Sequence, residues 1–174
     1  MHRGSALVYE NLRALPRAYL VPQVVTTDRP DGALAVLQQA NFDPRTTAVV
    51  NASAPVQLPG GALQGTAEIA EYTPDRVVVR TRQSRAALLV LADNFYQGWV
   101  ARVDGKEVSV LRTNHTFRGV VVGPGEHEVV FTFEPQELYR GLAISAAGLG
   151  LLALYGLWLL ARRLRRRGVA PITG

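Results

Sequence analysis

A short segment in the middle of the chain combines aromatic rings with polar groups, as glycan-binding surfaces do. Asp93 and Asn94 are followed by Phe95, Tyr96 and Trp99. Exposed rings could stack on sugars while the carboxylate accepts hydrogen bonds from hydroxyl groups. Alternatively Phe95 and Trp99 fill a protein core while Asp93 and Asn94 cap a turn, and we favour this interpretation because buried aromatic side chains dominate cores. The segment thus predicts either a glycan contact at Asp93, Tyr96 and Trp99 or an aromatic core plug.

A second candidate contact is the basic pair on either side of Phe117. Arg118 carries a guanidinium that can bind phosphate or carboxylate, and His115 lies three residues before it. We therefore include Arg118 among the candidate glycan contacts. The alternative, which the alternating pattern favours, is that both side chains simply point to solvent from a strand.

Groups for catalysis or for holding a cofactor do not form a recognisable set. His2, His115 and His127 lack the spacing of metal ligands. The chain has no cysteine, which excludes thiolate metal sites and thiol catalysis. It also has no glycine-rich phosphate loop, Ser-His-Asp set or paired carboxylates. We predict no catalytic residue, no cofactor and no metal in this chain.

The candidates lie in a region, Thr66 to Pro135, with the pattern of successive short strands closed by turns. One of these strands, Ala86 to Ala92, is apolar throughout and is expected to be buried on both faces. The other expected strands are Thr66 to Tyr72, Arg76 to Arg82, Trp99 to Val103, Glu107 to Leu111, His115 to Val122 and Glu126 to Phe133.

Two turns in this region predict hairpins. Asp104-Gly105 stands between Trp99 to Val103 and Glu107 to Leu111. Asp-Gly favours a two-residue turn because both central positions require positive φ. Gly123-Pro124-Gly125 predicts a second hairpin that joins the last two strands.

The first 65 residues are harder to assign. Asp31 to Ala40 predicts a short helix, Tyr19 to Val21 and Thr47 to Val50 predict strands, and Asn51 to Gly65 predicts a loop because it is rich in proline and glycine. The expected fold is mainly β: an antiparallel β-sandwich with one short helix over residues 1–138, followed by a single C-terminal transmembrane helix.

The transmembrane prediction rests on Gly141 to Ala161, which carries no charge. A helix of this length rises about 32 Å, enough to cross roughly 30 Å of hydrocarbon. Tyr139 and Arg140 mark one boundary, and Tyr155 and Trp158 lie near the other, as is typical of interfacial side chains. We place the membrane helix at 139–161, with the lipid bilayer as its partner.

An arginine cluster follows at once and predicts the orientation. It consists of Arg162, Arg163, Arg165, Arg166 and Arg167. Positive charge is retained on the cytoplasmic side, so residues 162–174 are expected in the cytoplasm, near anionic headgroups, and the body outside. The cluster holds five of the 19 basic residues, and the other 14 match the 14 acidic ones. The body is therefore neutral, which argues against nucleic acid as a partner.

The start of the chain does not fit this topology. The first ten residues contain no apolar stretch of the kind that exports a protein. The conflict disappears if the chain is the C-terminal piece of a longer protein whose upstream membrane spans place the body outside. We therefore expect a fragment.

Three stretches carry a family resemblance that extends over almost the whole chain. They are Tyr9 to Asn11 with Leu15 to Ala18, Asp93 to Trp99 running into Val103 to Lys106, and Asn114 to Arg118 with Gly123 to His127. In this ordered combination the chain resembles the C-terminal end of the YfhO family of bacterial multi-spanning membrane proteins.

The resemblance implies a place in cell-envelope glycosylation in the bacterial cytoplasmic membrane. Members are similar to glycosyltransferases that use lipid-linked sugars, and the family's catalytic acid lies far upstream of the matched region. The resemblance therefore implies a noncatalytic exterior module and membrane anchor of such an enzyme. An alternative is a carbohydrate-binding module that holds an envelope polymer near the active site of its parent enzyme.

Overall fold

The computed structural model describes residue 11, residues 14–29 and residues 31–167, with side chains up to residue 163. Tyr9 and Glu10, the first part of the family resemblance, lie outside the described residues, as do the last seven residues of the tail. The chain divides into two compact units, Met1–Glu134 and Pro135–Gly174.

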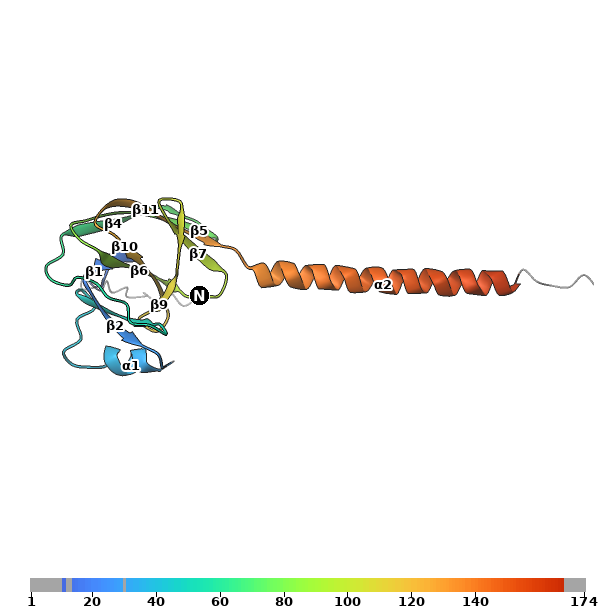
Figure 1. Cartoon of the computed structure of the whole chain (residues 1–174), viewed down its shortest axis with the longest axis horizontal. Coiled ribbons are helices and arrows are strands. Elements are labelled where there is room, and N and C mark those ends of the chain that lie inside the picture. Colours follow the sequence, from blue (N-terminus) through green and yellow to red (C-terminus); the bar gives the residue numbers. More distant parts are fainter. Residues whose placement is uncertain (1–10, 12–13, 30, 168–174) are drawn as a thin grey trace, which may run out of the picture. The chain divides into compact units, whose positions relative to one another are not determined.

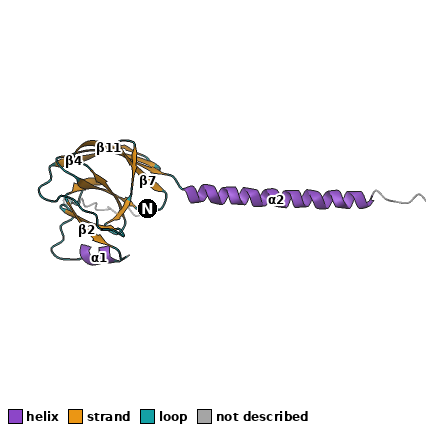
Figure 2. Cartoon of the chain, viewed as in Figure 1, coloured by secondary structure: helices purple, strands orange, loops and turns teal. Residues whose placement is uncertain are grey.

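The described residues of the first unit form eleven strands and one short helix. The strands of one sheet, here sheet A, run in the order β1-β6-β10-β9-β3-β2, and those of sheet B in the order β4-β5-β11-β7-β8. Figure 1 shows the two sheets as separate layers of this unit, and Figure 2 shows how little helix it contains. The bounds are β1 Ala18–Val21, β2 Gln23–Thr27, α1 Gly32–Leu37, β3 Thr47–Asn51, β4 Gly65–Tyr72, β5 Arg76–Gln83, β6 Ala87–Asn94, β7 Trp99–Val103, β8 Lys106–Val108, β9 Leu111–Thr113, β10 Phe117–Val122 and β11 Gly125–Phe133.

The main core lies between the two sheets and confirms the predicted sandwich. Val79 and Phe131 from sheet B meet Leu89 and Val120 from sheet A, all fully buried. The strand predicted to be buried on both faces is β6. Leu89 and Leu91 face the main core, while Leu88 and Val90 belong to a second cluster on the other side of sheet A.

That second cluster is covered by the proline-rich loop, which supplies Val56 and Leu58. The predicted short helix is present as α1. The strand β2 was not predicted, and it pairs in parallel with β3, while α1 lies between them in the chain. Pro22 and the short length of the segment hide β2 in the sequence, because Gln23–Thr27 has neither a long apolar run nor a clear alternation.

The Asp104-Gly105 hairpin is confirmed. β7 pairs with β8 in antiparallel register, and φ is 50° at Asp104 and 78° at Gly105. Ala101 is fully buried, whereas Trp99 and Val103 are half-buried against the same core. The second strand is shorter than predicted, since it ends at Val108 and residues from Leu111 onward cross to sheet A.

The second predicted hairpin is wrong. β10 pairs with β6 and β9 in sheet A, whereas β11 pairs with β5 and β7 in sheet B. Gly123-Pro124-Gly125 therefore carries the chain from one sheet to the other, with Gly125 at a φ of 114°. Val120 and Val122 of β10 and Val129 and Phe131 of β11 reach the core between the sheets from opposite sides.

The second unit is the long helix α2, Gln136–Arg167. Within the described residues one helix is long and apolar enough to cross a membrane, the part of α2 from Gln136 to Arg163. It contains the whole charge-free segment, with five residues before Gly141 and two after Ala161. Its 28 residues correspond to about 42 Å, more than the roughly 30 Å that a span requires.

Candidate functional site

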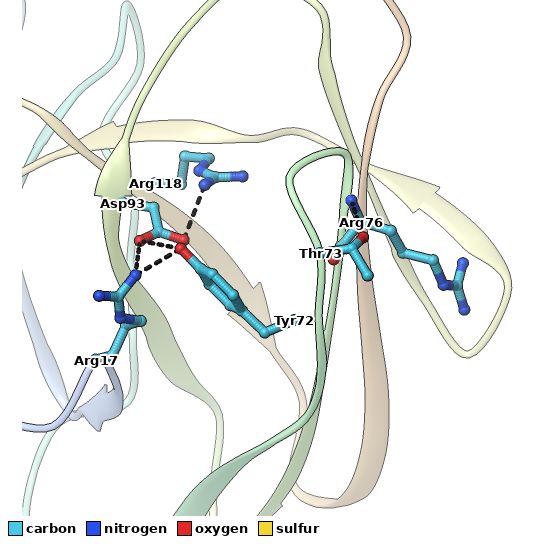
Figure 3. A network of polar contacts seen from close by, with 6 residues as sticks. All are labelled: Arg17, Tyr72, Thr73, Arg76, Asp93 and Arg118. Carbon is cyan, nitrogen blue, oxygen red and sulfur yellow. Dashed lines mark hydrogen bonds and ion pairs between the residues drawn. The ribbon is translucent and has the colours of Figure 1, made fainter.

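The predicted candidate Asp93 lies near the end of β6, where the strand leaves the buried core. Its side chain is 10% exposed, and each oxygen contacts a different arginine. Oδ2 accepts from Nη2 of Arg118 at 3.1 Å, and Oδ1 accepts from Nη1 of Arg17 at 2.9 Å (Figure 3). A buried carboxylate is costly unless it is paired, and here it has two cationic partners.

Tyr72 closes this network from sheet B. Its hydroxyl accepts from Nη1 of Arg17 at 2.5 Å and donates to Oδ1 of Asp93 at 3.3 Å (Figure 3). The Arg17 guanidinium also lies 4.9 Å from the centroid of the Tyr72 ring. The network therefore ties the segment before β1 to β4, β6 and β10.

Arg118 does not point to solvent, and that expectation is wrong. Its side chain is 4% exposed, and its guanidinium carbon lies 3.8 Å from the centroid of the Trp99 ring. Arg118 shares a face of β10 with Val120 and Val122, and it pairs with Leu91 of β6, so the alternation of the strand points its side chain toward the main core. Burial lowers the pKa of Arg118, and the Asp93 carboxylate opposes that change.

The buried guanidinium is only partly satisfied. Within the described part of the chain, Nε and Nη1 of Arg118 have no hydrogen-bond partner, although both atoms are buried. Stacking on Trp99 offsets part of this cost, since a guanidinium over an aromatic face is attracted to the ring. The side chain therefore holds hydrogen-bonding capacity that the domain itself does not use.

These residues line a hollow of about 360 Å³, here called the aromatic groove. Tyr96 stands at its rim with 62% of its surface exposed, and Trp99 packs against Phe133 with ring centroids 5.4 Å apart. The complete lining is Tyr72, Pro74, Asp93, Asn94, Tyr96, Trp99, Arg118 and Phe133. The structure thus brings together all four predicted glycan contacts.

A second hollow, of about 320 Å³, lies next to the aromatic groove and shares Asn94 and Tyr96 with it. It is here called the basic hollow and is completed by Phe95, Arg112, His115 and Thr116. The predicted strand residue His115 lies instead in the turn between β9 and β10, at a φ of 73°. Asn114 before it has a φ of 46° and is fixed by accepting from the Val49 amide at 2.8 Å.

The aromatic plug and turn-cap interpretation fits only in part. Trp99 is half-buried and packs against the main core, as that interpretation expected. Asp93 and Asn94 do not cap a turn but belong to β6. Arg17, Tyr72 and Arg112 were not predicted as part of this site, because they are distant in the sequence from the segment Asp93 to Trp99. One available signal was the isolated acid at the end of an apolar strand, because a half-buried carboxylate needs a cationic partner.

No metal-binding group is evident in the portion that the structure describes, where three or more His, Cys, Asp or Glu side chains never come together. Asp93 is also the one carboxylate among the residues that line the two hollows. The arrangement is therefore suited to binding through aromatic stacking and hydrogen bonds.

The comparison with known families finds a match in the part of the chain that contains both hollows. Residues 61–145 match the family model of the bacterial membrane protein YfhO. The YfhO match includes every lining residue of both hollows and the start of α2, and it confirms the resemblance carried by the second and third stretches. It does not extend to residues 9–18. No curated protein and no solved structure matches the chain.

Proposed function

We propose that this chain is a noncatalytic, glycan-binding module on the outer side of a bacterial membrane, anchored by α2, in a protein of the YfhO type. It would hold an envelope polymer for the glycosyltransferase activity that the family resemblance implies. This gives the carbohydrate-binding alternative precedence over a purely structural module.

One observation favours a glycan-binding module over a purely structural one. Tyr96 is 62% exposed at the rim of a groove that also presents the Trp99 edge and the Asp93 carboxylate. A purely structural module has no need of an exposed ring beside a buried, partly satisfied arginine. Rings supply stacking area at low entropic cost, and polar groups around them fix orientation.

A binding role fits the chemistry of the groove better than a catalytic one. Glycoside chemistry typically uses two carboxyl groups on either side of the scissile bond. Here the groove offers Asp93 alone, and both of its oxygens are engaged by Arg17, Tyr72 and Arg118.

The anchor supports a location at the membrane surface. Only Glu134 and Pro135 separate the groove residue Phe133 from the first residue of α2. The chain would therefore tether the groove close to the headgroups. The arginine cluster at the other end of α2 favours the cytoplasm for that end and the outside for the groove.

Intrinsic fluorescence tests the proposal directly, since the chain has two tryptophans, Trp99 and Trp158. In a Trp158→Phe background, the full chain in detergent micelles reports from the groove alone. We expect Trp99 emission to change on titration with cellohexaose or hexagalacturonate. Tyr96→Ala should weaken the affinity for whichever hexamer binds about fivefold, the effect of losing one stacking contact.

The matched control is Tyr139→Ala, which removes an equally exposed tyrosine from α2, outside the groove. It should leave the affinity unchanged. Equal affinities of the Tyr96→Ala and Tyr139→Ala proteins would refute stacking on Tyr96, and the lack of any response to both hexamers would refute the binding role.

A further inference from the structure

Two arginines lie directly opposite each other on neighbouring strands of sheet A. Arg112 of β9 is the register partner of Arg118 of β10. Side chains at directly opposed positions of an antiparallel pair point to the same face, with Cβ atoms about 5 Å apart. Two positive charges in this relation repel each other unless negative charge lies close by.

The negative charge nearby does not balance the positive charge of the arginines in this region. Arg17 and Arg118 share the single carboxylate of Asp93. Arg112 donates through Nε to the carbonyl oxygen of His115, and no carboxylate of the described chain lies within ion-pair distance of it. Among the three guanidiniums of Arg17, Arg112 and Arg118, the ion pairs of the described residues thus include one carboxylate, that of Asp93.

Further unused hydrogen-bonding capacity lies on both sides of Tyr96. Nε and Nη1 of Arg118 are buried without a partner on the side of the aromatic groove, and Nδ1 of His115 is buried without one on the side of the basic hollow, considering the described residues only. His115 has a left-handed φ of 73°, which costs a residue with a Cβ roughly 1 kcal/mol, and its carbonyl oxygen accepts from Nε of Arg112. Such strain persists where the surrounding structure imposes it.

We propose that the basic hollow is an oxyanion subsite, so that the module takes a glycan chain bearing carboxylate or phosphate groups. One sugar stacks at Tyr96, and an acidic substituent of that sugar or the next one lies against Arg112 and His115. This inference rests on the proposed glycan binding and adds the class of ligand. The two hollows meet at Asn94 and Tyr96, so the site spans more than one sugar unit.

The experiment compares hexagalacturonate with its fully methyl-esterified form, which is the same chain without the charges. With the full chain carrying Trp158→Phe in micelles, we expect the acid to bind about tenfold more tightly than the ester. Arg112→Gln should reduce that ratio to about twofold, because it removes a charge-assisted contact. Arg112→Lys should retain most of the ratio, and His115→Asn, which tolerates the left-handed backbone, should lower it. Galacturonate alone should bind far more weakly than the hexamer.

Arg80→Gln is the matched control, because it removes the same charge from an exposed position on β5, outside both hollows. It should leave the tenfold ratio intact. Raising the salt concentration should weaken binding of the acid and not of the ester, since exposed charges are screened.

Different results would overturn the oxyanion subsite and the glycan-binding role. Equal affinities for acid and ester, both reduced by Tyr96→Ala, would overturn the oxyanion subsite and leave glycan binding standing. No binding of either hexamer would overturn both. In nanodiscs, weaker binding of the acid with phosphatidylglycerol than with phosphatidylcholine, abolished by Arg112→Gln, would assign the hollow to lipid headgroups and overturn the glycan assignment.

Discussion

At the scale of single residues, Asp93 is the carboxylate that the described structure places against both Arg17 and Arg118. Asp93→Asn keeps the shape but leaves the buried Arg118 charge without a counter-charge. We expect this variant to lose about 3 kcal/mol of unfolding free energy, because breaking a buried pair from one side is strongly destabilising. For a domain of this size, the melting temperature should fall by about 10 °C.

Arg17→Gln provides the comparison, since the Arg17 side chain is 54% exposed. An exposed ion pair contributes little, so this variant should lose less than about 1 kcal/mol. Thermal unfolding of the parent, Asp93→Asn and Arg17→Gln proteins in the same micelles separates the loss of the buried ion pair from the loss of the exposed one. If Asp93→Asn melted with the parent, the network would be incidental to stability.

A second charged pair, away from the groove, makes stability depend on pH. Nδ1 of His127 lies 2.6 Å from Oδ2 of Asp104, while Oδ1 of Asp104 accepts from the Glu128 amide at 2.9 Å. The hydrogen bond to Asp104 raises the pKa of His127, and the bond from His127 lowers the pKa of Asp104.

The directions of the two pKa shifts determine how the stability of the domain changes with pH. Because the folded-state pKa of His127 exceeds its unfolded value of 6.5, its contribution is complete below about pH 6 and is lost as the pH rises through the raised pKa. The contribution of Asp104 is lost in acid, as the pH falls below its ordinary value of 3.8. The parent's melting temperature should therefore fall between about pH 6 and pH 8, and His127→Gln should reduce that fall. An unchanged pH profile in the variant would show that this pair does not carry the dependence.

The candidate site residues whose signal in the sequence was local lie together in the structure. Asp93, Tyr96 and Trp99 lie within seven positions of one another, and the structure keeps them in one groove. Arg17 is brought in by the pairing of β1 with β6, and Tyr72 by the packing of sheet B on sheet A, which no local pattern reveals. Arg118 shares the inward face of β10 with Val120 and Val122, so its burial agrees with the alternation of the strand, and the expectation of an outward side chain assigned this charged residue to the wrong face.

At the scale of elements, the β7–β8 hairpin offers a clean test of backbone strain. A Cβ placed on Gly105 would meet no atom within 4 Å, so the cost of a substitution there comes from its φ of 78°. We expect Gly105→Val to lower the unfolding free energy by more than about 1 kcal/mol, and Gly105→Asn to lower it less, because asparagine tolerates positive φ.

Thermal unfolding of the Gly105→Val and Gly105→Asn proteins beside the parent tests this prediction. A register slip in the hairpin would move Ala101 from the core to the solvent face, so the variants should also show whether the turn fixes the register. Three equal melting temperatures would contradict a role of this turn in stability.

Among the elements, those with a strong pattern were predicted and those defined by long-range pairing were not. The apolar run of β6 and the Asp-Gly turn each specify one structure locally. The chain after Val122 fits either a hairpin or a crossing between sheets, because glycine and proline permit both. The crossing is the arrangement in which Val120 and Val122 of β10 meet Val129 and Phe131 of β11 in the core between the sheets.

At the scale of the whole molecule, the chain joins a β domain to an apolar helix long enough to cross a membrane, and residues 61–145 match the family model of the bacterial membrane protein YfhO. The function proposed for the groove requires the domain to face the outside, where envelope glycans are found. Orientation is therefore the central claim, and it rests on the arginine cluster after the apolar segment.

Cysteine labelling in cells of the native bacterium tests this orientation most directly, since the chain has no cysteine of its own. Ser53→Cys places a thiol on an exposed loop of the domain, and Thr173→Cys places one beyond the arginine cluster. With a membrane-impermeant maleimide, we predict labelling of Ser53→Cys in intact cells and of Thr173→Cys only after permeabilisation. Labelling of Thr173→Cys in intact cells, with Ser53→Cys protected, would contradict the account.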